Sequence, residues 1–270
     1  MNSLTSRIKD GLKVMLGRSV ASPIAPNVQT PFCCNVCGNI NVTFNPFPMH
    51  YFYYLEKYQF VHNVFDGETI NYLHFTCQKC EASDRDRLHA LYFDEVKSKL
   101  GEKVISILDI APYKPFSAYL NRQPNFKVRT ADLFQEGVDD VVNIEDMHIY
   151  ADGTYDACLC SHVLEHIDYD EKGISEIYRV LKNGGWAIVM VPIITSLKED
   201  YHLPEATSEE DRWKHYGHPD HRRMYSKKGF VQKLEKAGFK VLQLGIDHFG
   251  KDQFEKLGIT ERSILYVVQK

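Results

Sequence analysis

The stretch that decides the fold is "DGTYDACLCSHVLEHIDYDEKGISEIYRVLKNGGWAIVMVPII", residues 152–194. Its two apolar runs, at 155–160 and 186–192, have the length of buried β-strands. Between them, residues 170–182 carry apolar side chains at helical spacing, and "NGG" can end that helix. A strand, a helix and a second strand in this order predict two parallel strands joined by a crossover.

The same alternation continues on both sides of this stretch. Further apolar strands are predicted at 103–108, 126–131, 240–246 and 263–269. A helix beginning near Asp84 is predicted to end at Gly101. The pattern indicates an α/β fold with a mostly parallel sheet covered by helices on both faces. The chain between the last two strands is too short for a comfortable parallel crossover, so the final strand is expected to be antiparallel.

Five of the seven cysteines fall between residues 33 and 80. They include two C-x-x-C pairs, and four thiolates satisfy a tetrahedral zinc ion with no open position, which predicts a structural site. The predicted ligands are Cys34, Cys37, Cys77 and Cys80. Four other residues could replace one of them: Cys33, His50, His62 and His74. The other two cysteines, Cys158 and Cys160, alternate within a predicted central strand and are expected to pack in the core.

The composition and the proline-rich segment suggest that the chain has three parts. Residues 1–30 are predicted to form an amphipathic helix and a proline-rich linker, 31–83 a zinc ribbon-like element, and 84–270 the main domain. The net charge of −4 gives no electrostatic argument for binding nucleic acid or an anionic membrane. No stretch approaches the roughly 20 apolar residues that span a bilayer, and no signal peptide is recognised, so a cytoplasmic location is expected.

The segment "LDIAPYKPF", residues 108–116, follows a predicted strand where nucleotide-binding proteins usually have a glycine-rich turn, yet it contains no glycine. Asp109 lies at the tip of this strand, and Asp132 ends the next strand about 20 residues later. A carboxylate in the position of Asp132 is suited to accept hydrogen bonds from ribose hydroxyls. The pair indicates a nucleotide-type cofactor.

The stretch 152–194 resembles class I S-adenosylmethionine-dependent methyltransferases in its order: acidic-x-aromatic-Asp, strand, "VLEHI", helix, "RVLKNGG", strand. The resemblance covers roughly residues 101–270 and implies a Rossmann-like seven-stranded sheet. "LDIAPYKP" resembles a subgroup in which an Ala-Pro pair replaces the loop glycines. That subgroup often has an N-terminal cysteine-rich element and a later segment similar to "DHRRMY", residues 220–225. S-adenosylmethionine carries no pyrophosphate, so it demands less close backbone approach than a dinucleotide does.

The resemblance implies a set of cofactor-binding residues: Asp109, Ala111, Asp132, Leu133, Asp146, Met147 and Ser161. Asp109 and Ala111 fall near the methionine portion, Asp132 at the ribose and Leu133 beside the adenine. The segment "NIEDMHIY" matches the place where the family has an acid near the adenine amine.

Ser161 and His162 follow the strand 155–160 and are expected to face the transferring methyl group. Glu165 and His166 are expected on the following helix, where they orient neighbouring groups.

Residues 198–230 form a long polar segment rich in histidine, arginine and aromatic residues, expected to cover the acceptor. His221 is the favoured catalytic base because of the resemblance, and His162 and His218 are the other catalytic candidates. Arg222 and Arg223 could bind a phosphate or carboxylate on the acceptor.

Two functions follow. The first is methyl transfer to a small molecule or sugar, at oxygen, in a biosynthetic pathway. The second is methylation of RNA or protein, with the zinc element and its neighbours Arg85 and Arg87 recognising the substrate. The acidic net charge favours the first. A non-catalytic binding protein would follow if the glycine-free loop does not hold the cofactor.

Overall fold

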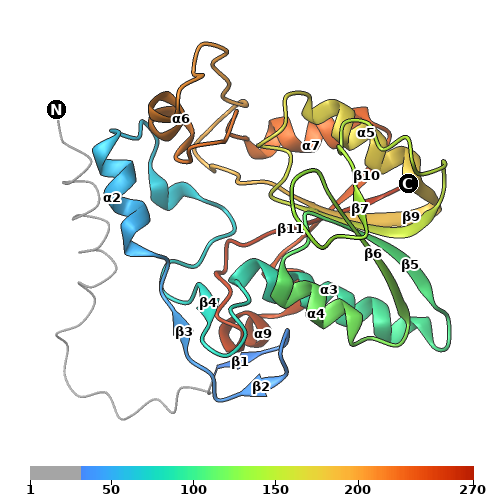
Figure 1. The fold of residues 1–270 in the computed structure, drawn as a ribbon. Helices are drawn as coiled ribbons and strands as arrows, with labels where there is room; N and C mark the ends of the chain where they lie inside the picture. Colours follow the sequence, from blue (N-terminus) through green and yellow to red (C-terminus); the bar gives the residue numbers. More distant parts are fainter. Residues whose placement is uncertain (1–31) are drawn as a thin grey trace, which may run out of the picture.

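The computed structural model describes residues 32–270, so the predicted N-terminal helix and linker lie outside the described residues. A seven-stranded sheet in the order β10-β11-β9-β8-β5-β6-β7 forms the centre of the molecule (Figure 1). Its strands are β5 (Ile105–Ile110), β6 (Phe126–Asp132), β7 (Asp140–Val141), β8 (Tyr155–Ser161), β9 (Leu181–Met190), β10 (Lys240–Leu244) and β11 (Leu265–Gln269). Only β11 runs antiparallel to its neighbours β9 and β10, which confirms the mostly parallel sheet and the antiparallel final strand.

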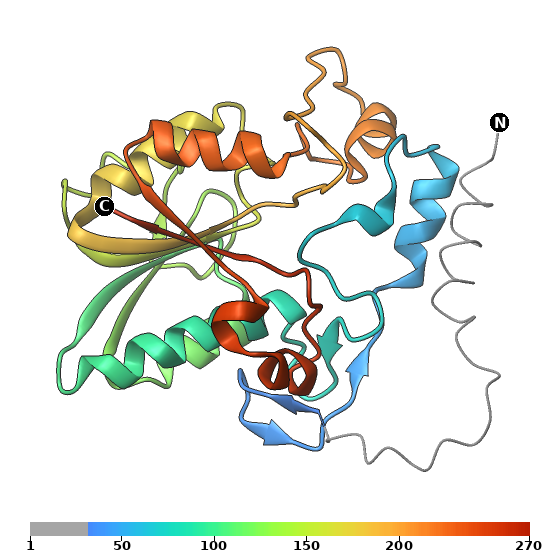
Figure 2. The same ribbon diagram turned by 180° about the vertical axis from the view of Figure 1, so that it is seen from behind.

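Helices cover both faces of this sheet. α3 (Asp84–Leu100) and α4 (Lys114–Asn121) lie on one face, and α5 (Asp170–Val180) and α7 (Lys227–Lys236) on the other (Figures 1 and 2). The short helices α8 (Ile246–Phe249) and α9 (Lys251–Lys256) join β10 to β11. α3 begins with a capping box between Ser83 and Asp86 and ends at Gly101, as predicted. No helix among residues 32–270 is long and apolar enough to cross a membrane.

The predicted helix over 170–182 is wrong at its end. α5 stops at Val180, because Leu181 already takes an extended conformation and pairs with Tyr155. The next paired residues are Ala157 and Trp186, so residues 182–185 stand opposite a single residue of β8. The "NGG" turn therefore forms an irregularity within β9 and does not end the helix.

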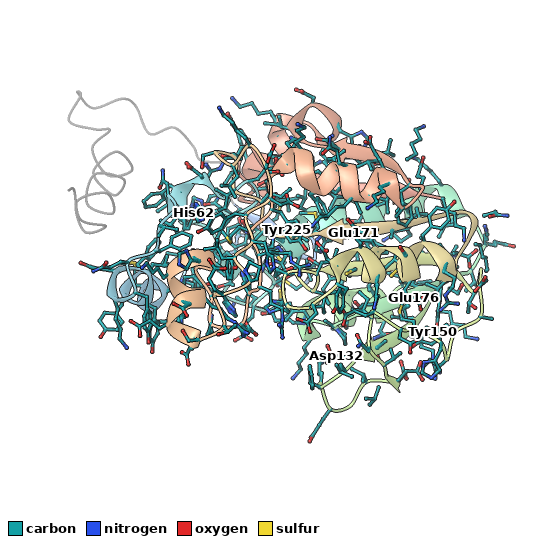
Figure 3. The ribbon with its side chains drawn as sticks, turned by 90° about the horizontal axis from the view of Figure 1, so that it is seen from above. His62, Asp132, Tyr150, Glu171, Glu176 and Tyr225 are labelled. Atoms are coloured by element: carbon teal, nitrogen blue, oxygen red, sulfur yellow. The ribbon has the colours of Figure 1, made fainter. Side chains whose placement is uncertain are left out.

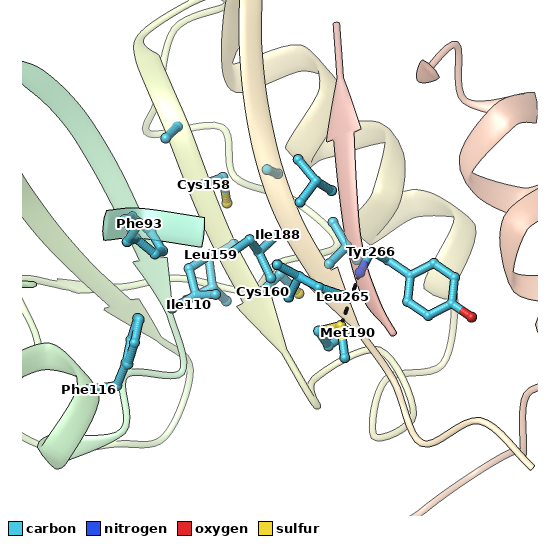
Figure 4. Packing of buried hydrophobic residues seen from close by; sticks show 14 of the residues in the cluster. Phe93, Ile110, Phe116, Cys158, Leu159, Cys160, Ile188, Met190, Leu265 and Tyr266 are labelled. Atoms are coloured by element: carbon cyan, nitrogen blue, oxygen red, sulfur yellow. Dashed lines mark hydrogen bonds between the residues drawn. The ribbon is translucent and has the colours of Figure 1, made fainter. Parts of the chain in front are cut away.

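The core is packed around β8 and β9. Cys158 and Cys160 are fully buried there, which confirms their expected core role. Figure 4 shows them beside Leu159 and Ile188, with the Tyr266 backbone N–H donating to Met190 Sδ at 3.4 Å. Because both faces of these strands are covered, their sequences read as near-continuous apolar runs.

The cysteine-rich part consists of two small antiparallel pairs. β1 (Cys33–Cys34) pairs with β2 (Asn39–Ile40), and β3 (Phe44–Asn45) pairs with β4 (Thr76–Cys77). The buried Arg87 of α3 ties this part to the rest of the protein, because its guanidinium donates to the carbonyls of His74, Phe75, Ala82 and Leu257. Arg87 is thus unavailable for binding phosphate, and that part of the alternative prediction is wrong.

A second hydrophobic cluster joins two distant parts of the chain, residues 47–75 and 194–224, which we call the cover. The cover includes α2 (Met49–Lys57), the 3-10 helix η1 (Val64–Asp66) and α6 (Glu209–Tyr216). Trp213 of α6 stacks on Tyr54 and Tyr58 of the N-terminal part, with ring centroids 5.1 and 6.1 Å apart. The aromatic segment between the cysteine pairs therefore shares a core with the long polar segment.

Candidate active site

The four predicted zinc ligands come together in the structure. Their sulfur atoms lie within 4.8 Å of one another, and the Sγ atoms of Cys34 and Cys80 are 3.8 Å apart. Zinc bound tetrahedrally at about 2.3 Å from each sulfur requires a sulfur–sulfur distance of about 3.8 Å, so the donor set fits a structural zinc ion. Asn39 Nδ2 donates to Cys37 Sγ at 3.2 Å. The four alternative ligands, Cys33, His50, His62 and His74, do not belong to this group.

The loops at the carboxyl ends of β5 and β8 contain unusual backbone. Ala111 has φ 53° and His162 has φ 60°, the left-handed region that L-residues with side chains rarely adopt. β5 and β8 are neighbours in the sheet, so the two residues leave it side by side. Ala111 adopts a conformation usual for glycine, which explains how a loop without glycine makes this turn. Such strain is typical of functional sites.

The two predicted acidic residues lie at the ends of neighbouring strands. Asp109 is buried and accepts a hydrogen bond from Ser117 Oγ at 2.8 Å, and burial raises the pKa of its carboxyl to about 7. Asp132 Oδ1 accepts from the backbone N–H groups of Phe134 and Gln135 at 2.6 and 2.7 Å. Both of these bonds go to one oxygen, which leaves Oδ2 for another donor.

The remaining predicted cofactor residues differ in exposure. Leu133 and Asp146 are exposed, Ser161 is half-buried and Met147 is fully buried. Phe134, next to Leu133, is 89% exposed, an unusual value for such an apolar side chain. Sequence reasoning did not single out Phe134, although its place two residues after the end of β6 was a usable signal.

A cavity of about 340 Å³ lies between the end of β8 and the cover. The cover contributes aromatic side chains to it, including Phe47, Tyr51 and Tyr72. Six polar side chains that line it are Arg85, His162, Glu165, His166, His218 and His221. Residues 44–75 therefore do more than fill the cysteine-rich part, since they form one wall of the cavity. In the view of Figure 3, His62 of the cover and Asp132 lie on opposite sides of Tyr225.

His162 and Glu165 form a close pair in the lining of this cavity. His162 Nδ1 is 3.1 Å from Glu165 Oε1, and both carboxylate oxygens of Glu165 are buried without a hydrogen bond. Burial raises the pKa of Glu165 to about 7. Burial also lowers the pKa of His162 well below its ordinary value, with a smaller effect from the charge of Arg85. Glu165 and His166 lie in a turn that precedes α5, so their expected place on a helix is wrong.

Three histidines meet above this pair. The rings of His218 and His221 stack with centroids 4.4 Å apart, and the ring of His166 lies 4.7 Å from that of His221 at 83°. Asp220 joins them, with its Oδ2 3.3 Å from His166 Nδ1. Burial is the main cause that lowers the pKa of His221 well below its ordinary value. All three predicted catalytic histidines, at 162, 218 and 221, therefore line one cavity.

Arg222 and Arg223 do not line the cavity. Arg222 Nε donates to the carbonyl of His166 at 2.9 Å. Arg223 donates to the carbonyls of Ile167 and Asp168 and pairs with the carboxylate of Asp170 at 2.9 Å. The two arginines connect the loops that carry the histidines. Their predicted role in holding an acceptor anion in the cavity does not agree with the structure.

A protein-family model described as a methyltransferase domain matches residues 83–244, more than half of the chain. The chain belongs to this family. It is an S-adenosylmethionine-dependent methyltransferase with the seven-stranded Rossmann-like fold described above.

Several solved structures are similar to this chain at low sequence identity. The [4+2]-cyclase SpnF is 14% identical over 72% of this chain and 84% of its own, with a TM-score of 0.42. A SAM-dependent methyltransferase from Archaeoglobus fulgidus is 19% identical over 66% of this chain and 94% of its own, with a TM-score of 0.41. An S-adenosylmethionine-dependent methyltransferase from Mesorhizobium loti is 12% identical over 67% of this chain and 98% of its own, with a TM-score of 0.43. No curated protein matches the sequence.

Proposed function

We propose that this enzyme transfers a methyl group from S-adenosylmethionine to an oxygen of a small-molecule or sugar acceptor in a biosynthetic pathway. The observation that carries the proposal is the cavity of about 340 Å³ at the end of β8, bounded by the His162–Glu165 pair and the aromatic cover. Its volume suits a small ligand, and it combines apolar walls with a few convergent polar groups.

The cofactor is expected at the carboxyl ends of β5, β6 and β8, where open α/β sheets bind their ligands. S-adenosylmethionine supplies a methyl group on a positively charged sulfur. We assign Asp109 and Ala111 to the methionine portion and Asp132 Oδ2 to the ribose hydroxyls. Leu133 and the exposed Phe134 offer apolar surface for the adenine.

The remaining assignments follow the resemblance. Asp146 would accept a hydrogen bond from the adenine amine, and Ser161 would lie near the methyl group. The buried Met147 supports the loop beneath the adenine.

We assign the general base to His162. It follows β8 directly, next to the expected methyl group, and its Nδ1 lies 3.1 Å from Glu165 Oε1. The acceptor hydroxyl would give its proton to His162 while its oxygen bonds to the methyl carbon and the carbon–sulfur bond breaks. Sequence reasoning favoured His221, but His221 and His218 lie on the cover side of the cavity, where they would contact the acceptor. Holding the acceptor in line with the methyl group supplies much of the acceleration.

Arg85 offers a charge for an anionic acceptor. Its side chain lines the cavity, and no ion pair to it occurs among residues 32–270. A carboxylate or phosphate on the acceptor would pair with this guanidinium.

Methylation of RNA or protein is the less favoured function. None of the four clustered cysteines lines the cavity, and Arg87 beside them is buried. The cysteine cluster would have to recognise a large substrate at a distance from the cavity.

Calorimetric titration with S-adenosylmethionine and S-adenosylhomocysteine tests the cofactor assignment. We expect Asp132→Ala to weaken binding by about tenfold or more, because a hydrogen bond to a charged group contributes about 1.5–3 kcal/mol. Asp152→Ala, at an exposed carboxylate near the opposite ends of the strands, is the matched control and should bind like the wild type. Equal affinity in Asp132→Ala and wild type would remove Asp132 from the site. If the wild type bound neither compound, the protein would be a non-catalytic member of its family.

A further inference from the structure

We propose that His166, His218, Asp220 and His221 bind a divalent transition-metal ion at the wall of the acceptor cavity. Each side chain offers one ligand atom, and these atoms all lie within 4.8 Å of one another. Ligand atoms about 2.1 Å from a zinc ion lie about 3–4 Å apart, so small side-chain movements would complete the coordination shell. This site is distinct from the cysteine cluster, because it shares no residue with it.

The chemistry of the four groups selects the class of metal. Three imidazoles and one carboxylate suit zinc, nickel, iron(II) or cobalt, whereas magnesium and calcium prefer oxygen ligands. The Nδ1 atom of His221 is buried without a hydrogen-bond partner, so it is available as a metal ligand.

Neighbouring residues hold these groups in position. The backbone N–H of Arg222 donates to the carbonyl of Glu165 at 2.8 Å, and its guanidinium donates to the carbonyl of His166. Arg223 fixes the following residues of the same turn through Ile167 and Asp168. The loop 218–223 and the turn 162–168 are therefore joined on both sides of the histidines. A site held this firmly loses little conformational entropy when the ion binds.

The position of the ion gives it a role that rests on the proposed function. His166, His218 and His221 line the same cavity as His162. A cation there would attract an oxygen of the acceptor and favour loss of its proton to His162. The acceptor class is therefore one with an oxygen ligand beside the methylated hydroxyl, such as a diol or a hydroxy acid.

Cobalt(II) binding to the full-length protein tests the site without any need for turnover. Cobalt bound by imidazoles gives weak visible bands, whereas cobalt bound by thiolates adds an intense charge-transfer band in the near ultraviolet. We expect the wild type to take up two metal equivalents per chain, one of them without the charge-transfer band. The double variant His218→Ala/His221→Ala should lose that equivalent and keep the thiolate-bound one.

Two further variants keep the test decisive. Asp220→Asn changes an exposed side chain, so it should fold normally while it weakens cobalt binding by about tenfold or more. His248→Ala removes an exposed histidine outside the cavity and should bind cobalt like the wild type. Uptake of a single, thiolate-bound equivalent by the wild type would overturn the proposal, and so would unchanged uptake by the double variant. Cobalt binding as expected, with no binding of S-adenosylhomocysteine, would leave the metal site standing and reject the proposed function.

Discussion

The two groups of side chains that could hold a metal ion in this protein differ in origin and surroundings. The cysteine cluster comes from two C-x-x-C pairs, each running from the end of a short strand into a turn, and none of its residues lines the cavity. The histidine cluster comes from two loops about 50 residues apart, and three of its four residues line the cavity. Four thiolates leave zinc no open position, while imidazoles beside a cavity can share an ion with a ligand. We propose that the cysteine cluster stabilises the fold and that the histidine cluster takes part in the chemistry.

The largest expected effect concerns the cysteine cluster. Cys77→Ser should remove the metal and destabilise residues 33–80 by several kcal/mol, because binding of structural zinc contributes directly to folding. Hydrogen exchange of this region and the melting temperature would measure the loss. Cys33→Ser is the matched control, since Cys33 lies next to the cluster but outside it and should change little. Equal stability of the two variants would end the structural interpretation of the cluster.

The second prediction concerns the histidine side of the comparison. His162→Ala should lower kcat by about 100-fold to 10,000-fold, the usual contribution of a general base. The affinity for S-adenosylmethionine should stay within about twofold, because we assign His162 to the acceptor and not to the cofactor. Once an acceptor is found, steady-state kinetics would measure kcat, and calorimetry would measure the affinity for S-adenosylmethionine.

Its control is His50→Ala, at an exposed histidine outside the cavity. A normal kcat in His162→Ala would exclude His162 as the base and return the role to His218 or His221. A loss of folding in His162→Ala would show in the melting temperature, and His162→Gln would then replace it.

A third prediction sharpens the comparison with a residue that belongs to neither cluster. Burial raises the pKa of Asp109 to about 7, so the folded protein keeps a proton that the unfolded chain releases near pH 4. Folding therefore takes up a proton between these values, and stability falls as the pH rises from about 4 to 7. Asp109→Asn should not show this fall in stability. At pH 8 its free energy of unfolding should exceed that of the wild type by up to about 4 kcal/mol.

Urea unfolding at several pH values would measure that difference. Asp252→Asn, at an exposed position in α9, is the control and should follow the wild-type curve. Parallel curves for Asp109→Asn and wild type would mean that the carboxyl group of Asp109 is ionised throughout this range.

The sequence predicts the parts of this protein that local patterns determine. Strand and helix periodicity predicted the sheet except for the two-residue β7, and the C-x-x-C spacing predicted all four clustered cysteines, because each pattern lies within a few residues. The predicted end of α5 was wrong because the pairing of Leu181 with Tyr155 outweighed the turn propensity of "NGG". The left-handed backbone of Ala111 had no local signal at all.

The site itself was only half predictable. Three of the cavity histidines were singled out from the sequence, but His166 and Asp220 gain their significance only when distant loops meet. The role of residues 44–75 was equally hidden, since the cover forms from two segments more than 100 residues apart. Packing between distant segments determines such features, and the periodicity of the sequence does not predict that packing.

A crystal structure with S-adenosylhomocysteine bound would test the central claim most directly. The account predicts the ribose beside Asp132, the adenine near Leu133 and the sulfur at the end of β8, facing the His162 side of the cavity. Such a pose would show that the glycine-free loop holds the cofactor against the cavity. Density for the compound at any other place, with the ends of β5, β6 and β8 free, would contradict the account.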